Sequence, residues 1–419
     1  MLIRGGRLID PSQGIDALRD LRIAGGRVTE IGEHLQPRSG DTVVDAHNAF
    51  VAPGFIDMHV HLREPGFVDK ETIATGTQAA LQGGFTAVAC MPNTEPALDR
   101  PEALARLEAI VARDGRCRVY PVAAITRDRA GNRSVDFSAL AAAGAVGFSD
   151  DGNTVMNARV LYQAALQARE VAGVFISHAE DEVLKGDALM SAGPVADALG
   201  VEGAPSLSED IIVARDLLIA LETRKAWHIA HLSTARGLDL LRWSRSHGGE
   251  ATCEVTPHHL LLTDETVREL GAAGKVNPPL RSQADSRALR DGVRDGTVDV
   301  FATDHAPHTA QEKSGDLRSA AVGFSGLEIA IGAFALAVPN LSLERFVTLL
   351  STNPARILHV EGGTLRVGAS ADVTIFADRP WAVDPTVFAS KGKSTPFSGR
   401  TFPRRAVATI VGGELRWRL

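Results

Sequence analysis

A pair of histidines two positions apart is the strongest chemical signal in the sequence. His59 and His61 end an apolar stretch, residues 54–61, whose residue types are typical of a β-strand. Residues two apart on a strand point to the same side, so both imidazoles can reach one point in space. Two converging imidazoles suit a metal ion, but such a pair can also consist of two unrelated surface or core histidines.

Further polar residues stand at the ends of four other apolar stretches. If these stretches are parallel strands of one barrel, their ends meet at its C-terminal mouth, where such barrels carry their active sites. Four histidines and two carboxylates would then form a ligand set suited to Zn²⁺, with two ions able to share a carboxylate and a hydroxide. The competing interpretation is that these strand-end polar residues coincide by chance. The set consists of His59, His61, the adjacent pair Asp150-Asp151, His178, His231 and Asp304.

The remaining histidines with a clear position are expected to be structural. His34, His47, His247 and His359 lie away from the strand ends. His228 lies inside the sixth candidate strand and is either a satisfied core histidine or a partner that orients a metal ligand.

The elements that must position these residues alternate between about Pro53 and Val360. Helical segments with apolar spacing, at 71–84, 101–115, 157–173 and 209–224, lie between short apolar strands. Eight such alternations, without a GxGxxG motif after the first strand, predict a (β/α)8 TIM barrel rather than an open doubly wound sheet. The helix after the seventh strand is weakly marked. The candidate strands are 54–61, 85–93, 118–126, 145–151, 174–180, 226–233, 251–259 and 299–307.

The two ends of the chain share another texture. Residues 1–52 and 361–419 consist of short alternating strands separated by glycine-containing turns. We therefore predict an α/β protein with two domains: a small composite β-sandwich domain built from both termini, and a barrel domain at 53–360.

Composition narrows the class of protein. The 419 residues include 44 basic and 51 acidic side chains, a formal net charge of −7, with 44% hydrophobic residues. This balance predicts a soluble globular protein with a small-molecule substrate and argues against nucleic acid or membrane partners. Three cysteines without a CxxC pair, and an N-terminus without the features of a signal peptide, predict a cytoplasmic protein.

Eight motifs together resemble those of bacterial (type I) dihydroorotases, in the amidohydrolase superfamily. The tail SKGKSTPFSG (390–399) is similar to that family's C-terminal signature. The resemblance implies a zinc-dependent hydrolase of cyclic amides that reversibly cyclises N-carbamoyl-L-aspartate to (S)-dihydroorotate in pyrimidine (UMP) biosynthesis. The motifs are GFIDMHVHLREPG (54–66), MPNTEP (91–96), GFSDDG (147–152), SHAED (177–181), HLST (231–234), EVTPHHLLLTDE (254–265), KVNPPLR (275–281) and TDHAPH (303–308).

The resemblance also assigns roles at the metal centre. His59 and His61 match the ligands of one zinc ion, and His178 and His231 match those of a second. Asp151 matches the carboxylate that, with a hydroxide, bridges the ions; many relatives use a carboxylated lysine, but no lysine stands at this strand end. Asp304 matches the residue that ligates a metal and acts as the acid/base.

The substrate contacts follow in the same way. Arg63, with His61, Asn93 and His308, matches the residues around the substrate carboxylate, for which a guanidinium fork is well suited. Asn277, Val322 and Gly323 match further contacts, the last two through the backbone of a lid candidate at 308–326. Here the chain reads Ala321-Val322-Gly323 where the family usually has Phe-Gly. Without the resemblance, Arg63 could be a solvated loop arginine, Asn277 a turn residue and His308 an exposed imidazole.

Two other functions compete with this one. An allantoinase or hydantoinase would keep the chemistry, but such relatives commonly bridge with a carboxylated lysine and lack the arginine of HLREPG. An inactive scaffold for aspartate transcarbamoylase would typically have lost metal ligands. The resemblance also implies a homodimer, and association with aspartate transcarbamoylase is compatible with an active enzyme.

Overall fold

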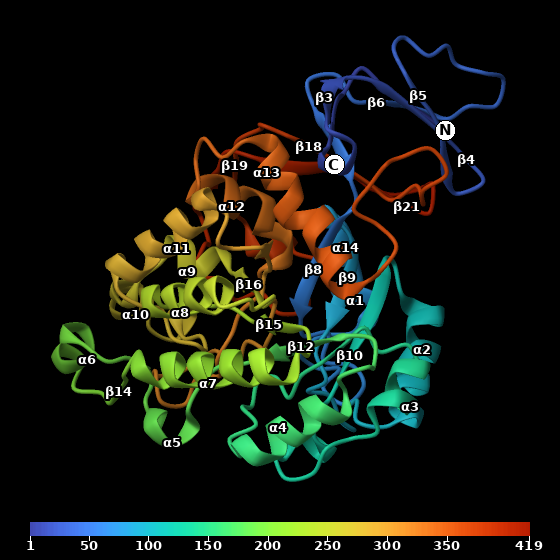
Figure 1. Ribbon diagram of the computed structural model, residues 1–419. Coiled ribbons are helices and arrows are strands. Elements are labelled where there is room, and N and C mark those ends of the chain that lie inside the picture. Colours follow the sequence, from blue (N-terminus) through green and yellow to red (C-terminus); the bar gives the residue numbers. More distant parts are fainter.

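The computed structural model describes residues 1–419, with both termini in a β-rich part beside a larger barrel (Figure 1). The barrel is an eight-stranded sheet in which neighbouring strands are parallel and follow one another in chain order. It is closed by a bridge between Val60 and His305, where His61 N donates to His305 O at 2.8 Å. The strands are β8 (Phe55–Val60), β9 (Phe85–Cys90), β10 (Arg118–Ala123), β11 (Gly147–Phe148), β12 (Val174–Ser177), β15 (Trp227–Ile229), β16 (Thr252–Val255) and β17 (Val300–Phe301).

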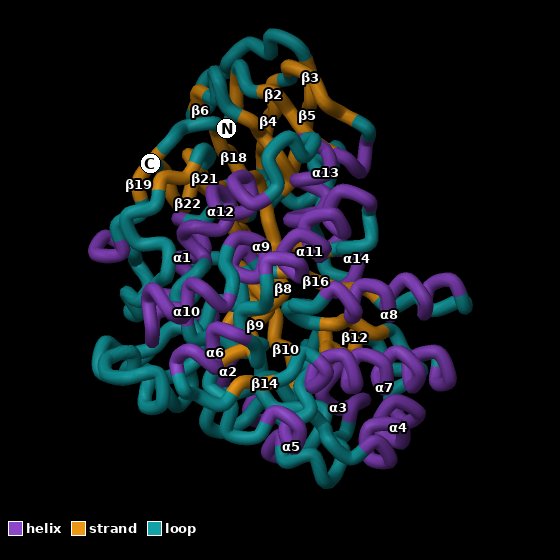
Figure 2. The backbone as a smooth tube through the Cα atoms, turned by 90° about the vertical axis from the view of Figure 1, so that its left-hand side faces the viewer, coloured by secondary structure: helices purple, strands orange, loops and turns teal.

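The sequence predicts this barrel correctly because its strands are buried on both faces. Every residue of β8 and β9 is buried, as expected of parallel strands that are covered by helices outside and filled with side chains inside. Figure 2 shows β8, β9 and β10 in the interior, with helices around them. Each of the eight predicted stretches contains one barrel strand, and the prediction of a TIM barrel is confirmed.

The helices follow the predicted segments. Four of them are α1 (Ile73–Gln82), α2 (Pro101–Asp114), α4 (Ala158–Gln167) and α7 (Leu207–Thr223). The weakly marked helix after the seventh strand is α11 (Gln283–Asp295), which follows two short helices. The others are α3 (Phe137–Ala142), α5 (Glu182–Lys185), α6 (Pro194–Leu199), α8 (Ala235–Ser246), α9 (Pro257–Leu261), α10 (Asp264–Leu270), α12 (Ala330–Ala337), α13 (Leu343–Val347) and α14 (Asn353–Leu358). None of the helices combines the length and apolar character needed to cross a bilayer.

Both ends of the chain contribute to two further sheets. One has the order β5-β4-β1-β6 and the other β22-β21-β18-β7-β2-β3, and 16 buried hydrophobic residues form a common core. The division at 52/53 and 360/361 stays a prediction. The strands are β1 (Leu2–Arg4), β2 (Arg7–Asp10), β3 (Ile15–Leu18), β4 (Asp20–Ala24), β5 (Arg27–Gly32), β6 (Val43–Asp45), β7 (Phe50–Pro53), β18 (Val373–Ala377), β21 (Arg405–Val411) and β22 (Glu414–Arg418).

One part of the C-terminal region leaves these sheets and packs on the barrel. Strands β19 (Trp381–Ala382) and β20 (Thr401–Phe402) pair with each other as an antiparallel stem. Between them, Phe388 and Phe397 are buried in a cluster with Phe324, which follows the last barrel strand. The connection between β19 and β20 is therefore in contact with the barrel, which the sequence did not reveal.

Candidate metal centre and active site

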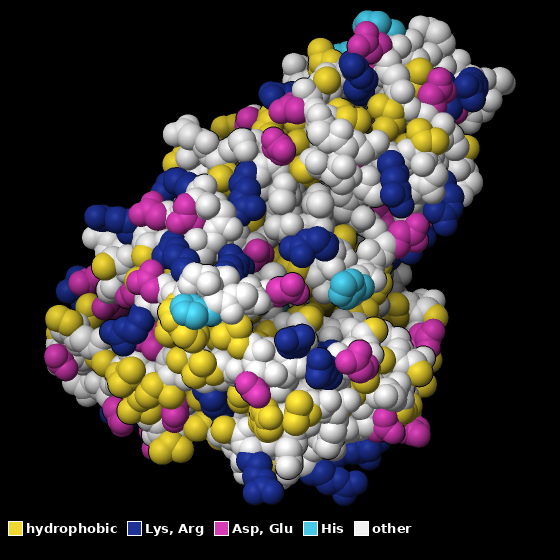
Figure 3. All heavy atoms as spheres, viewed as in Figure 1, with side chains coloured by type: hydrophobic (Ala, Val, Ile, Leu, Met, Phe, Trp, Pro, Cys, Tyr) yellow, Lys and Arg dark blue, Asp and Glu magenta, His cyan; other side chains and the backbone are white.

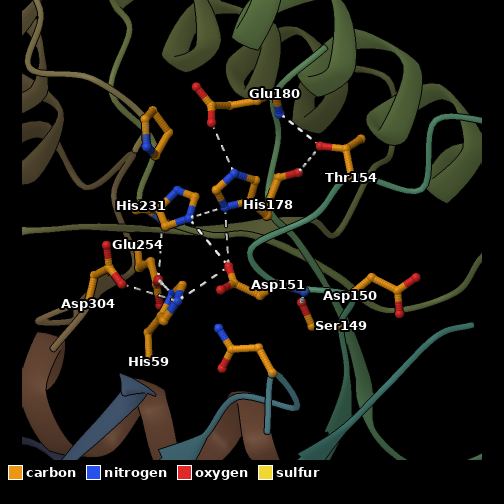
Figure 4. Close-up of polar contacts among 12 residues, drawn as sticks. His59, Ser149, Asp150, Asp151, Thr154, His178, Glu180, His231, Glu254 and Asp304 are labelled. Atoms are coloured by element: carbon orange, nitrogen blue, oxygen red, sulfur yellow. Dashed lines mark hydrogen bonds and ion pairs between the residues drawn. The ribbon is translucent and has the colours of Figure 1, made fainter. Parts of the chain in front are cut away.

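Two groups of metal-ligating side chains meet at the mouth of the barrel and share Asp151. His59 and His61 lie on one side, and His178 and His231 on the other, with the ligand atoms of each group within 4.8 Å of one another. All these side chains are buried. Figure 4 shows His59, His178 and His231 turned toward Asp151, as the sequence predicts for residues at strand ends.

The distances place the Asp151 carboxylate at the centre. Asp151 Oδ1 lies 3.4 Å from His59 Nε2, 3.3 Å from His178 Nδ1 and 3.5 Å from His231 Nε2. Its other oxygen, Oδ2, lies 3.5 Å from His61 Nε2. The arrangement brings four imidazole nitrogens around one carboxylate.

Asp304 completes this group from the last barrel strand. Its Oδ1 lies 3.1 Å from His61 Nε2 and 3.6 Å from His59 Nε2. Burial disfavours its charged form, but the hydrogen bond from His61 and the nearby His59 lower the pKa of Asp304 below its usual value. Asp304 is therefore a carboxylate at neutral pH.

The residues fit a bound divalent cation. His59 Nε2 and Asp151 Oδ1 are buried, face each other and have no hydrogen-bond partner. Buried polar atoms almost always have a partner, so a cation between these two atoms would satisfy both. Imidazole nitrogens with carboxylate oxygens are the donor set that zinc accepts.

Backbone strain marks the same region. Arg63, His231 and Asp304 have φ angles of 62°, 32° and 49°. The left-handed region is sparsely populated by residues other than glycine, and each such residue costs about 1–3 kcal/mol. The surrounding barrel holds these three residues in place, and all three aim their side chains at the mouth.

The buried carboxylate of Glu254 lies behind the candidate metal ligands and contacts two histidines. Glu254, on β16, lies 2.6 Å from His59 Nδ1 through Oε1 and 3.2 Å from His228 Nε2 through Oε2. With Nδ1 bound to Glu254, His59 turns Nε2 toward the centre. His228 Nδ1 in turn lies 2.7 Å from Thr252 Oγ1, so His228 is the partner that holds Glu254 rather than a ligand.

A second carboxylate does the same for His178. Glu180 Oε2 lies 3.1 Å from His178 Nε2 and 2.6 Å from Lys185 Nζ, which leaves His178 Nδ1 facing Asp151. Burial opposes ionisation of both glutamates, but their histidine and lysine neighbours keep the pKa values of Glu180 and Glu254 at about 2. Both are permanently charged at neutral pH and hold the imidazoles in fixed orientations.

The predicted substrate contacts line one cavity beside this centre. The cavity has a volume of about 230 Å³ and includes His61, Asp151, His178, His231 and Asp304 in its wall. The structure thus brings the predicted metal and substrate residues together, and their individual roles stay predictions. The predicted substrate contacts on the wall are His61, Arg63, Asn93, Asn277, His308, Val322 and Gly323.

Arg63, Asn93 and His308 form the polar rim of this cavity. Arg63 Nε donates to Pro307 O at 3.2 Å, and its guanidinium Nη2 lies 3.2 Å from His308 Nε2. Asn93 Oδ1 lies 2.9 Å from His61 Nδ1. A fixed guanidinium beside an imidazole is a site for an anion, above all a planar carboxylate.

Comparisons with known proteins agree with this geometry. A family described as Dihydro-orotase-like matches residues 49–236, and the Amidohydrolase family matches residues 269–416. A dihydroorotase of Pelotomaculum thermopropionicum is 46% identical over 99% of this chain and 98% of its own length. One of Syntrophus aciditrophicus is 43% identical over 99% of this chain and 98% of its own length. The chain belongs to the dihydroorotase family.

Solved structures share the fold of this chain over almost its whole length. An L-hydantoinase (dihydropyrimidinase) from Arthrobacter aurescens has a TM-score of 0.89 at 24% identity, covering 99% of this chain and 95% of that one. A D-hydantoinase from Thermus sp. has a TM-score of 0.84 at 23% identity, covering 100% of this chain and 96% of that one. The likeness concerns the fold.

One residue of the cavity wall was not predicted from the sequence. Arg129 lines the wall, and its Nη1 donates to Asp151 O at 2.6 Å. It belongs to a polar loop with two further arginines, Arg127 and Arg133, which is typical of a solvated connection.

The role of Glu254 could have been predicted from the sequence, because a glutamate inside an otherwise apolar strand needs a buried partner.

The second half of the predicted lid lines the cavity through Val322 and Gly323. Val322 O lies 2.8 Å from His308 Nε2, and Gly323 has a φ of 108°. A Cβ on Gly323 would lie 2.6 Å from Ala306 Cβ, so only glycine fits there. At the other end of the loop, Glu312 forms an ion pair of 2.6 Å with Lys70.

Proposed function

We propose that this protein is a dihydroorotase, which interconverts N-carbamoyl-L-aspartate and (S)-dihydroorotate in pyrimidine biosynthesis. The observation that carries the proposal is a single cavity in which two metal-ligand groups that share Asp151 lie beside the fixed guanidinium of Arg63. Dihydroorotate has the two matching features, a cyclic amide to be cleaved and a carboxylate to be held. The identities of 43–46% to dihydroorotases support the same activity.

Zinc is the metal we propose, with two ions per subunit. His59 and His61 would hold one ion, His178 and His231 the other, and Asp151 would bridge them, with Asp304 next to the first. Bound zinc lowers the pKa of water from roughly 16 to about 7 and polarises a carbonyl group, which together allow amide hydrolysis at neutral pH.

The residues of the chain bind the substrate and move the proton. Arg63, with Asn93 and His308, holds the substrate carboxylate and so places the ring amide toward Asp304. Asn277 and the backbone of Val322 and Gly323 contact the pyrimidine edge.

Asp304 provides the proton transfer. Its carboxylate accepts the proton of the attacking water at an Oδ atom and passes it to the ring nitrogen as the amide bond breaks. In the biosynthetic direction it takes the proton from the ureido nitrogen instead and delivers it to the hydroxyl group that leaves as water when the ring closes. Such acid/base catalysis contributes about 10² to 10⁴-fold to the rate.

Metal analysis combined with activity assays tests this proposal. We expect purified protein to contain zinc, to hydrolyse dihydroorotate and to cyclise N-carbamoyl-aspartate, and to lose both activities on chelation. Replacing Arg63 by alanine should collapse turnover of dihydroorotate. Undiminished activity in metal-free protein would contradict the proposal.

Because hydantoinases share this fold, cyclic amides without a carboxylate are the competing class of substrate. We expect hydantoin and allantoin to be poor substrates, because Arg63 would face no anion. Turnover of an uncharged hydantoin equal to that of dihydroorotate would favour the competitor. The presence of all the predicted metal ligands speaks against an inactive scaffold.

We also propose a cytoplasmic homodimer. Hydrophobic side chains gather on the lower half of the face in Figure 3, over the region of α5 and α7. Val183 on α5 and Leu218 on α7 are 84% and 53% exposed. Apolar patches of this kind commonly mark protein interfaces. Light scattering of the protein alone tests for the dimer. Light scattering after aspartate transcarbamoylase is added tests for association with that enzyme.

A further inference from the structure

The C-terminal motif SKGKSTPF has no place in the function described so far. Its first residues, with Ala389, form the stretch 389–394, which we call the strap. The strap lies in the connection whose base is the β19–β20 stem and whose Phe388 and Phe397 are buried against the barrel. It is thus anchored at both ends.

The strap packs directly behind the loop that carries His308. Ser325 N donates to Ser394 O at 2.9 Å, and Ser325 Oγ donates to Gly392 O at 2.8 Å. A Cβ on Gly392 would lie 2.7 Å from Pro307 Cβ and 3.1 Å from His308 N. The strap therefore packs so closely against Pro307 and His308 that position 392 has no room for a side chain.

A buried carboxylate joins the strap to the barrel at the same place. Glu71 accepts hydrogen bonds from Ser390 Oγ and, at 3.2 Å, from Lys391 N. Its Oε2 also lies 3.3 Å from His305 Nε2. Glu71 is fully buried, so these contacts fix the strap relative to the end of the last barrel strand.

The strap thereby reaches the predicted anion site through one further contact. Arg63 Nε donates to Pro307 O, and its Nη2 lies beside His308 Nε2. Gly392 packs against Pro307, because a Cβ at 392 would meet Pro307 Cβ. From these contacts we infer that the strap is a positioning element, which holds Pro307 and His308 and through them the guanidinium of Arg63 in the orientation that binds a substrate carboxylate. This inference rests on the proposed function.

Replacing Gly392 by alanine tests the inference, because the added methyl group must displace Pro307. We expect KM to rise about 10-fold or more for both dihydroorotate and N-carbamoyl-aspartate, with a smaller fall in kcat because Arg63 also places the ring amide, since misplacement of such a group by an ångström costs up to about 100-fold. Ser390→Ala removes one contact to Glu71 and should give a smaller increase of about 2 to 10-fold. Ser398→Ala, at an exposed position of the same connection, is the matched control and should match the wild type.

A double-mutant cycle separates positioning from general damage. The affinity for orotate, a planar pyrimidine carboxylate without a hydrolysable dihydro ring, is measured by calorimetry on zinc-loaded protein. Gly392→Ala should weaken orotate binding in the wild-type background and have no further effect in an Arg63→Ala background, because both changes act on one contact. Equal losses in both backgrounds would overturn the inference.

The outcomes distinguish a failure of the proposed function from a failure of the proposed role of the strap. A wild-type protein without dihydroorotase activity overturns the proposed function. An active wild type with Gly392→Ala and Ser390→Ala indistinguishable from it overturns the role of the strap alone. If Gly392→Ala does not fold, Ser390→Ala carries the test, with zinc content and melting temperature as checks on integrity.

Discussion

The orientation of His59 depends on Glu254, a residue that touches no substrate. Its carboxylate is bound to His59 Nδ1 and His228 Nε2. Replacing Glu254 by glutamine keeps the shape and removes the charge, so His59 becomes a weaker and less fixed ligand. Such changes typically cost 10 to 100-fold in metal affinity, and we expect a loss of about that size.

Competition with a chelator of known affinity measures this loss directly. Glu250→Gln, at an exposed position of the chain shortly before β16, is the control and should bind metal like the wild type. Unchanged metal affinity in Glu254→Gln would show that the carboxylate has no such role.

A second prediction concerns Arg129. Its guanidinium donates to Asp151 O and adds a positive charge to the cavity wall. Arg129→Gln should lower kcat/KM by about 10 to 100-fold, the range expected when a hydrogen bond involving a charged group is lost. The fall must be equal in both directions, because the equilibrium constant fixes their ratio, but KM should rise more for N-carbamoyl-aspartate, which carries two carboxylates.

Steady-state kinetics in both directions at low ionic strength provide the measurement. Arg133→Gln, on the same loop but exposed, should leave both values of KM unchanged. A normal KM for N-carbamoyl-aspartate in the Arg129 variant would remove this residue from substrate binding.

The convergence of side chains at the barrel mouth was predictable, whereas the groups that orient them were less so. His59 and His61 are identified by a strand period of two, and Asp304 by its place at a strand end, both of which are local patterns. Arg129 reaches Asp151 from a loop whose composition is that of a solvated turn, so its role arises only from the folded geometry.

Among the elements, the short helix η4 (Leu327–Ile329) carries the half-buried Glu328, whose Oε1 accepts a hydrogen bond from Ala389 N of the strap. Burial raises the pKa of Glu328 to about 8; the hydrogen bond from Ala389 N opposes the shift and the nearby Glu71 adds to it. The unfolded chain releases this proton above about 4.5, whereas the folded protein keeps it until about 8. The stability that the neutral group contributes is therefore lost as pH rises from about 4.5 to about 8.

Glu328→Gln should remove this pH dependence, since a neutral amide keeps the acceptor for Ala389 N. We expect the variant to be more stable than the wild type at pH 8.5, by of the order of a few kcal/mol, with little difference at pH 5. Thermal unfolding at both values of pH measures the difference, with exposed Glu344→Gln as the control. An equal effect at both values would mean that Glu328 is ionised throughout.

The strap shows why some elements could not be predicted. The barrel strands repeat one apolar pattern, and each is recognisable from its own residues. SKGKSTPF consists of the residue types of a solvated loop, yet Ser390 is buried and bonded to Glu71 and Ser325, both distant in the chain. Contacts of this range leave no local pattern.

For the whole molecule, the terminal sheets and the barrel share part of their packing. The large core of 62 buried hydrophobic residues includes Ile9, Ala52 and Phe376 from the terminal sheets. The two ends of the chain also pair directly, since β7 lies between β2 and β18. We therefore expect the barrel and the terminal sheets to unfold together in one transition.

Arg118 and Asp372 form an ion pair across this junction. Arg118, at the start of β10, donates from Nε at 2.7 Å and from Nη2 at 3.2 Å to the two oxygens of Asp372, which is 5% exposed. Arg118→Ala leaves the Asp372 carboxylate buried without its cation, and we expect the free energy of unfolding to fall by about 1.5–3 kcal/mol.

Urea unfolding of the zinc-loaded protein, followed by tryptophan fluorescence and circular dichroism, tests both statements. The Arg118→Ala transition should move to lower urea with the two signals still coincident, because the shared core couples the two parts more strongly than one ion pair does. Arg116→Ala, exposed and two residues away, should leave the midpoint unchanged. If the signals separate in the wild type, the terminal sheets form a unit that unfolds independently of the barrel.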